Sequence, residues 1–268
     1  MPPVPPAILR ALSLPLDPSK SSLSTSALGS GFTTTGRIRA SVPSSDNDGR
    51  EEERQYFVKT SSSGKAAEEM FRGEYESLNA IASVVPGFCP RALAWGPLDE
   101  GGGSKGKTFF LVTEYLDLSS GRSSASSSGP SSLAHRLAKL HSTPAPPDPV
   151  TGRRLFGFPV PTYCGDTRQP NRFCASWADF FANERLLAVL GESERRNGKD
   201  AALRELVEKT AREVVPALLG DDHLGYDREG KGEGSRLSSY MGTCGAGMPV
   251  PGVSWEASGK KTRRGQEQ

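Results

Sequence analysis

The chain has 268 residues, with 33 lysines and arginines against 31 aspartates and glutamates, and its formal net charge is +2. This near balance of charge gives no indication of a surface for nucleic acid or for a membrane. Hydrophobic residues make up only 35% of the chain, and glycine and proline together make up about 19%, against roughly 12% in average proteins. We therefore expect long loops or linkers around one or two domains with a real core.

No part of the sequence contains the roughly 20 consecutive apolar residues that a membrane-spanning helix needs. The first 16 residues contain Arg10, start with four prolines among six residues and lack a small-residue cleavage site, so they are a poor secretory signal. The four cysteines form no C-x-x-C pair and have no clustered histidine, which argues against a zinc site or a disulfide framework. We expect a cytoplasmic protein with free thiols.

Five elements are predicted in the first half of the chain. Thr35 to Val42 and Gln55 to Thr60 predict two strands with a polar loop between them. Lys65 to Val84 predicts a helix, because its apolar residues recur with a 3.6-residue period and no proline interrupts them. Arg91 to Leu98 and Thr108 to Leu116 predict a hairpin of two further strands. The predicted order is strand, strand, helix, strand, strand.

Residues 101 to 108, GGGSKGKT, match the phosphate-loop pattern G-x-x-x-x-G-K-[ST]. That pattern requires a strand before the loop and a helix after it, so that backbone N–H groups and the helix N-terminus converge on the phosphates. The sequence that follows here, FFLVTEYL, predicts a strand. We therefore interpret this segment as a glycine-rich hairpin loop.

The second half of the chain predicts a linker and a helical region. Ser119 to Ser132 is a segment of low complexity that predicts a flexible linker between two lobes. Beyond it, helices are predicted for Leu133 to His141, Ser176 to Leu190 and Ala201 to Leu219. From about Ser235 the sequence loses all periodicity, which predicts a disordered basic tail. The predicted division is an N-terminal lobe at residues 1–117, a linker at 118–132, a partial helical C-terminal lobe at 133–234 and the tail at 235–268.

A glycine-rich turn and two charged residues are candidates for a binding site. Gly29, Ser30 and Gly31 precede a predicted strand, where bare backbone could approach phosphates closely, although they could equally form a surface turn. The alternation of side chains along QYFVKT draws Lys59 toward an apolar interior. Glu74 lies on the apolar face of the predicted helix, where a hydrophobic residue is expected. Each of these two residues could be a surface charge, but buried lysine and glutamate need partners, so we expect Lys59 and Glu74 to pair.

The order of these elements predicts the nucleotide lobe of a protein-kinase-like fold. In that lobe a strand lysine holds the α- and β-phosphates of ATP, and a helix glutamate orients the lysine. Glu114, Tyr115 and Leu116, at the end of the predicted hairpin, would form the hinge against the adenine. The predicted fold class is α+β, a two-lobed kinase-like fold with a complete N-terminal lobe and an incomplete helical C-terminal lobe.

Two longer stretches carry a family resemblance: AEEMFRGEYESLNAI (67 to 81), preceded by GSGF and YFVKT, and FGFPVPTYCGDTRQPNRFCASWADFFANERL (156 to 186). They resemble the ketosamine-3-kinases, that is the fructosamine and ribulosamine 3-kinases, in a fungal-type version, over about residues 27 to 234. The resemblance implies ATP and Mg²⁺ as cofactors. It also implies transfer of the γ-phosphate to the 3-hydroxyl of a ketosamine on a glycated protein or a small amine. The phosphorylated sugar then leaves, which restores the amine.

The catalytic segment of that family reads HGDLWSGN. Phosphoryl transfer needs its Asp to accept the proton of the attacking hydroxyl and its Asn to hold metal. Neither is present, because His135, His141 and His223 open no HGD sequence. A metal-binding Asp farther on is missing as well. We therefore expect this chain to contain no catalytic residue and no metal ligand of the family, and to be inactive as written.

The sequence of residues 236 to 249, RLSSYMGTCGAGMP, suggests why the segment is missing. Permitted codons for these residues, read one frame over, encode PVLLHGDLWSGNA, with the His made from the Tyr240 and Met241 codons. An accidental match of that length, where the motif belongs, is improbable. We therefore expect a shift of the reading frame near Gly234 or Ser235, and a non-homologous tail at residues 235–268.

The shifted frame would also remove the rest of the C-terminal lobe. We therefore expect that the apolar faces of the helices Trp177 to Leu190 and Leu203 to Leu219 have no partner, although such faces are normally buried against another element.

Two other classes of function stay open beside the enzyme. The chain could be a non-catalytic kinase-like protein that binds ATP, or an unstable fragment with no role.

Overall fold

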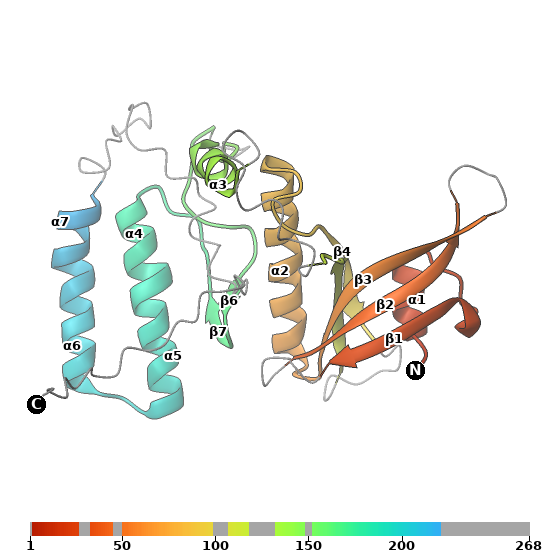
Figure 1. Ribbon diagram of the computed structural model, residues 1–268. Helices are drawn as coiled ribbons and strands as arrows, with labels where there is room; N and C mark the ends of the chain where they lie inside the picture. Colours follow the sequence, from red (N-terminus) through yellow and green to blue (C-terminus); the bar gives the residue numbers. More distant parts are fainter. Residues whose placement is uncertain are drawn as a thin grey trace, which may run out of the picture.

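The computed structural model describes residues 2–26, 33–44, 50–98, 107–117, 132–147 and 152–220. A β-sheet and a helical part lie on either side of one long helix, α2 (Lys65–Val84) (Figure 1). No helix within these ranges is long and apolar enough to cross a membrane. The antiparallel sheet and the helices make this an α+β fold, as the sequence predicts.

The sheet has five antiparallel strands in the order β1-β2-β3-β5-β4. Their bounds are β1 (Ser21–Ser26), β2 (Thr34–Pro43), β3 (Glu51–Ser61), β4 (Ala92–Pro97) and β5 (Phe109–Glu114). The last four strands confirm the four that the sequence predicts. Because β5 is a strand and follows residues 101–108 directly, the phosphate-loop pattern lacks the helix that it needs.

Helix α1 (Pro6–Ala11) covers one face of the sheet, and the sequence analysis did not predict it. Pro6 stands in its first turn, where proline is tolerated because an N–H group there would have no partner within the helix. Ile8 and Leu9 are buried in a core that also contains Ile38 and Val58 of the sheet. A short 3-10 helix, η1 (Pro18–Lys20), leads from α1 to β1. The proline-rich N-terminal segment is therefore part of this lobe's core.

Helix α2 packs on the opposite face of the sheet. Its bounds are those predicted from the apolar period, and the helix ends just before Pro86. Phe71 is fully buried and shares a core with Leu78 of the same helix and Leu111 of β5. Leu140 of α3 (Leu133–Ser142) joins the same core, which ties α3 to α2.

A small hairpin and two long helical runs follow α3. The hairpin consists of β6 (Thr162–Cys164) and β7 (Thr167–Gln169) and lies next to α2 (Figure 1). The first run is α4 (Trp177–Phe181), the π-helical η3 (Ala182–Leu187) and α5 (Ala188–Asn197). The second is α6 (Ala201–Lys209), the π-helical η4 (Thr210–Val214) and α7 (Val215–Leu219). Both predicted helices therefore exist, and the first extends to Asn197.

The two helical runs pack against each other, so the prediction that their apolar faces have no partner is wrong for one face. Ala178 and Ala182 of the first run form a core with Ala211 and Val215 of the second. The second run keeps a different face exposed, however. That face carries Leu203, Leu206, Val214 and Leu218.

Several predictions fall outside the described residues. These are Gly29, Ser30 and Gly31, almost all of the predicted linker, and the tail at residues 235–268. Ser132, the last residue of the predicted linker, caps the N-terminus of α3, because its hydroxyl accepts a hydrogen bond from the backbone N–H of His135 at 3.2 Å. The predicted domain boundaries stay predictions.

Candidate functional site

A lysine and a glutamate from different elements meet on the α2 side of the sheet. The Nζ atom of Lys59 on β3 donates a hydrogen bond to Oε1 of Glu74 on α2 at 2.6 Å. The two side chains are 23% and 24% exposed, so the pair is partly buried and still open to solvent on one side. This confirms the predicted pairing, against the alternative of two separate surface charges.

The spacing of the residues explains why the two side chains meet. Along β3, successive side chains point to opposite faces, so Val58 enters the core beneath α1 and Lys59 points to the side of α2. On α2, Glu74 follows Phe71 by three residues and precedes Leu78 by four, and residues at these spacings share one helix face. The same packing that buries Phe71 and Leu78 therefore brings Glu74 to the sheet.

The three predicted hinge residues lie at the end of β5. The backbone N–H of Glu114 donates to the carbonyl oxygen of Arg91 at 3.0 Å, and the Glu114 carboxylate accepts from the backbone N–H of Arg91 at 3.0 Å. The guanidinium of Arg37 on β2 lies 5.5 Å from the ring centroid of Tyr115. Leu116 is 50% exposed. Glu114 is therefore hydrogen-bonded to the residue that precedes β4. The role of these three residues as a hinge stays a prediction.

The predicted glycine-rich turn lies outside the described residues, but the strand ends on either side of it are described. Ser26 of β1 pairs with Thr35 of β2, and Thr35 pairs with Lys59 of β3. The two strands that flank the turn therefore end next to the lysine. This is the relative position that a phosphate-binding turn and its lysine require.

Helix α2 has a second acidic contact, which the sequence analysis missed. Glu69 accepts a hydrogen bond from the hydroxyl of Tyr163 at 2.9 Å, and it forms an ion pair with the guanidinium of Arg168, whose Nη2 donates at 3.1 Å. Burial alone would raise the pKa of Glu69, but the hydrogen bonds from Arg168 and Tyr163 outweigh it and lower that pKa. Burial, and then the bond to Glu69, raise the pKa of Tyr163. Glu69 is therefore ionised and Tyr163 protonated at neutral pH.

One feature of the sequence could have indicated this contact. Gly73 stands in the interior of α2, where glycine costs roughly 1 kcal/mol relative to alanine. A glycine at such a position often marks a close approach of another segment. The segment that approaches is Pro161 and Thr162, at the start of β6.

A surface depression and the distribution of possible metal ligands are two further features of the described residues. An open depression of about 430 Å³ lies at the N-terminal end of α2, and its lining includes Lys65, Trp95 and Lys107 but none of the predicted site residues. Among the side chains that the structure describes, no three of His, Cys, Asp or Glu gather into a group that could hold a metal ion. The Lys59 ammonium fits a phosphate oxygen.

Comparison with known proteins gives a family model and relatives whose names describe kinases. A family model described as fructosamine kinase matches residues 16–223. The mouse protein named ketosamine-3-kinase is 30% identical over 195 residues, which cover 63% of this chain and 59% of the mouse protein. A Synechocystis protein named "Probable ketoamine kinase slr1563" is 31% identical over 169 residues, covering 63% of this chain and 49% of that protein. The chain thus spans only about half the length of these relatives.

A solved structure supports the fold. It is a protein from Thermobifida fusca YX-ER1 that was assigned as a fructosamine-3-kinase, with a TM-score of 0.50 and 22% sequence identity. The match covers 84% of this chain and 64% of the other. Because the fructosamine kinase model matches residues 16–223, well over half of the sequence, the chain belongs to the fructosamine kinase family.

Proposed function

We propose that the gene of this chain encodes an ATP-dependent ketosamine 3-kinase, and that the described sheet and α2 form its nucleotide site. The reaction would transfer the γ-phosphate of ATP to the 3-hydroxyl of a ribulosamine or fructosamine on a glycated amine. The single observation that carries this proposal is the 2.6 Å contact between Lys59 and Glu74, because it combines the kinase lysine with the glutamate that orients it.

The proposed role of Lys59 follows from charge and position. Its ammonium group can donate to the α- and β-phosphates of ATP and offset part of their negative charge. Glu74 holds the ammonium group in place, so that less conformational freedom is lost when the phosphates bind. The turn at Gly29, Ser30 and Gly31 would cover the phosphates. Glu114, Tyr115 and Leu116 would flank the adenine.

The substrate hydroxyl and the metal would need residues that the 268 residues of this sequence do not contain in the family's arrangement. The HGDLWSGN segment is absent, and the proposed cause is the shifted frame near Gly234 or Ser235. For the chain as written, a second candidate function is therefore a non-catalytic ATP-binding protein. We propose the cytosol as its location, because Cys164 and Cys174 are free thiols, as is usual in a reducing compartment.

Nucleotide binding by the purified chain tests the proposal. We expect ATP to bind, Lys59→Met to weaken its affinity roughly tenfold through the loss of one charge-assisted hydrogen bond, and Glu74→Ala to weaken it through misplacement of Lys59. Isothermal titration measures these affinities, and Lys65→Met is the matched control, because Lys65 is an exposed lysine on α2. Equal ATP affinity in the wild type and in both site variants would show that Lys59 and Glu74 do not belong to the nucleotide site.

The purified chain also tests the expectation that it has no kinase activity. We expect no phosphorylation of a fructosamine substrate by the chain as written, with radiolabelled ATP as the readout. Phosphorylation at a rate typical of kinases, roughly 1–100 per second, would contradict the proposal that the missing segment is required.

A further inference from the structure

We propose that the hairpin β6–β7 holds α2 at the position where Glu74 reaches Lys59, and that Glu69, Tyr163 and Arg168 are positioning residues for that pair. The statement about the pair rests on the contacts of this structure alone. Its consequence for ATP rests on the proposed function.

The first contact is between two backbones. A Cβ atom placed on Gly73 would lie 2.5 Å from the carbonyl oxygen of Pro161 and 3.4 Å from Cα of Thr162, so only glycine permits this approach. Ser77, one turn further along, is buried and donates to the carbonyl oxygen of Gly73 at 2.7 Å. Gly73 immediately precedes Glu74. The hairpin therefore touches α2 directly beside the residue that binds Lys59.

The second contact is directional and charged. Glu69 lies one turn before Gly73 on the same helix face, and it binds Tyr163 of β6 and Arg168 of β7. Both strands of the hairpin thus bind one carboxylate. The Glu69 side chain is only 27% exposed, which strengthens charge-assisted hydrogen bonds relative to those at a fully exposed site.

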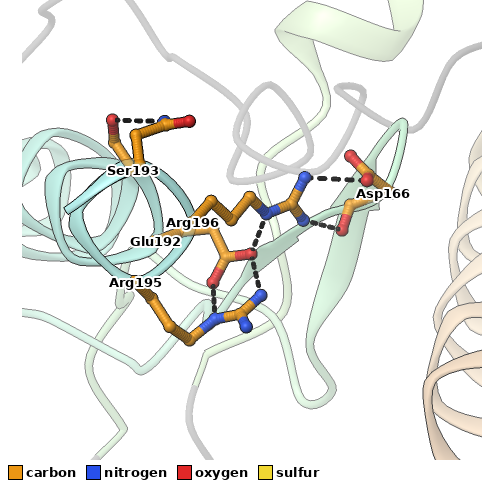
Figure 2. Close-up of polar contacts among 6 residues, drawn as sticks. Asp166, Glu192, Ser193, Arg195 and Arg196 are labelled. Carbon is orange, nitrogen blue, oxygen red and sulfur yellow. Dashed lines mark hydrogen bonds and ion pairs between the residues drawn. The ribbon is translucent and has the colours of Figure 1, made fainter.

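The hairpin is held from its other side as well. Figure 2 shows Arg196 of α5 reaching the hairpin turn, where Nη1 donates to Oδ2 of Asp166 at 2.7 Å and Nη2 donates to the Asp166 carbonyl oxygen at 3.0 Å. Glu192 binds both Arg196 and Arg195. Asp166 and Arg195 are largely exposed, so the pairs that contain them contribute little to stability. Together they connect α5 to α2 through the hairpin.

Asn171 gives the hairpin its buried support. Its amide nitrogen donates to the carbonyl oxygen of Val160 at 3.0 Å and to Oγ1 of Thr162 at 2.9 Å. Its amide oxygen accepts from Nη2 of Arg185, on η3, at 2.7 Å. Asn171 and Thr162 are completely buried. The strand that touches Gly73 is therefore fixed to the helical part by hydrogen bonds away from water.

The physical reason for a positioning role is the difference between apolar and polar contacts. The apolar packing of Phe71 and Leu78 on the sheet is non-directional, so it tolerates a small slide of α2 along its axis. The bond between Lys59 and Glu74 does not tolerate such a slide, because the heavy atoms of an ionic hydrogen bond stay within a narrow range of separations, typically about 2.7–2.9 Å. The hairpin contacts set the axial position that this bond requires.

The test compares Glu69→Gln with Glu68→Gln, its matched control. Glu68 is the preceding residue on α2 and is exposed, so both variants remove the same charge from the same helix. Tyr163→Phe is a milder second variant, since it removes only one hydroxyl. The readout is the coupling free energy between Lys59 and Glu74. It is obtained from urea unfolding in a double-mutant cycle of Lys59→Met and Glu74→Gln, which is repeated in each of these backgrounds.

We expect this coupling to be present in the wild type and in Glu68→Gln, to fall by more than half in Glu69→Gln, and to fall in part in Tyr163→Phe. A merely structural role of Glu69 would lower the urea midpoint and leave the coupling unchanged, and that result would overturn the proposal. A coupling of zero in the wild type would overturn it too. None of these outcomes depends on nucleotide binding.

A second measurement tests the consequence for ATP. Because Lys59 would contact phosphates only, we expect Glu69→Gln to weaken ATP roughly tenfold, the effect of one misplaced charge-assisted hydrogen bond, and to leave adenosine unchanged. In a Glu74→Ala background, Glu69→Gln should have no further effect on ATP. If the wild type binds no ATP, the proposed function fails while the coupling still decides the positioning role. Equal ATP affinity in Glu69→Gln and wild type would show that the hairpin does not act on the nucleotide.

Discussion

At the scale of single residues, Asn171 shows how one side chain can decide the position of a segment. Its backbone has φ +66°, a left-handed conformation that asparagine adopts more readily than most other non-glycine residues. In this conformation the buried side chain reaches Val160 and Thr162 on one side and Arg185 on the other. The residue therefore combines an unusual backbone with two buried hydrogen bonds and a third that is partly buried.

We predict that Asn171→Ala lowers the free energy of unfolding by about 3–5 kcal/mol. Roughly 1 to 2 kcal/mol of this would come from alanine in the left-handed region, and the rest from buried polar groups that lose a partner. Asn171→Gly is the control, because it loses the same hydrogen bonds without the backbone cost. Urea unfolding should show the glycine variant to be the more stable of the two. An alanine variant as stable as the glycine variant would contradict the backbone part of this account.

At the scale of elements, two consecutive residues of the π-helical turn η3, Glu184 and Arg185, both bind the segment that follows the hairpin. Glu184 accepts from Nε of Arg172 at 2.8 Å and from the backbone N–H of Arg172 at 3.0 Å, while Arg185 binds Asn171. Residues 171 and 172 follow the hairpin after one intervening residue, Pro170. Helix, turn and hairpin therefore form one connected polar unit, and α2 docks on it through Glu69.

We predict that the docking of α2 on this hairpin weakens in acid. The pKa of Glu69 is lower in the folded chain than its ordinary value, which is about 4.3 in an unfolded chain. A carboxylate with a lowered pKa stabilises the fold at pH values above the unfolded pKa. That stability is lost as the pH falls through the lowered folded pKa. Arg168 and Tyr163, whose pKa values are raised, keep their protons over this range.

Urea midpoints of the wild type and Glu69→Gln between about pH 7 and pH 3 measure this effect, because that range spans the ordinary pKa of glutamate. The wild type should be the more stable protein at pH 7, and the difference should shrink below about pH 4. Glu68→Gln controls for the general effect of net charge. A difference that does not change with pH would mean that the Glu69 charge contributes nothing to docking.

At the scale of the whole molecule, the exposed apolar face of α6 and α7 bears on the proposed frame shift. Leu206 and Leu218 are 65% and 66% exposed, and Leu203 and Val214 are exposed as well. Contiguous exposed apolar residues favour association with another surface or aggregation. Ala211 of η4 and Val215 of α7 are buried against α4 and η3. The second helical run is therefore packed on one side, while the four exposed residues have no cover among the described residues.

We predict that restoring the alternative frame from about Ser235 yields HGDLWSGN followed by further helical sequence. The repaired protein should phosphorylate ribulosamines or fructosamines with ATP and Mg²⁺, and it should aggregate less because the added helices would cover the apolar face. Sequencing of the transcript across codon 234, a kinase assay and size-exclusion chromatography measure these outcomes. Lys59→Met in the repaired protein is the control for activity. An early stop in the shifted frame would show that the frame-shift account is wrong.

The sequence by itself determined the elements that are long enough to show a period. The strands β2, β3, β4 and β5, helix α2 and the two long helical runs were all predicted, because an apolar pattern over many residues selects one secondary structure. It also determined the pairing of Lys59 with Glu74. Each is a charge at a position where its own element predicts an apolar side chain, and burial requires them to pair.

Only the tertiary structure decided the short elements and the contacts between distant segments. Helix α1 has six residues, which is fewer than two helical turns, and the strands β6 and β7 have three residues each. These lengths are too short to show the period of a helix or of a strand. Glu69 and Tyr163 are separated by 94 residues, and nothing in either local sequence names the other as a partner. Their meeting depends on how closely the hairpin approaches the helix at Gly73, a distance that is set when both are already packed.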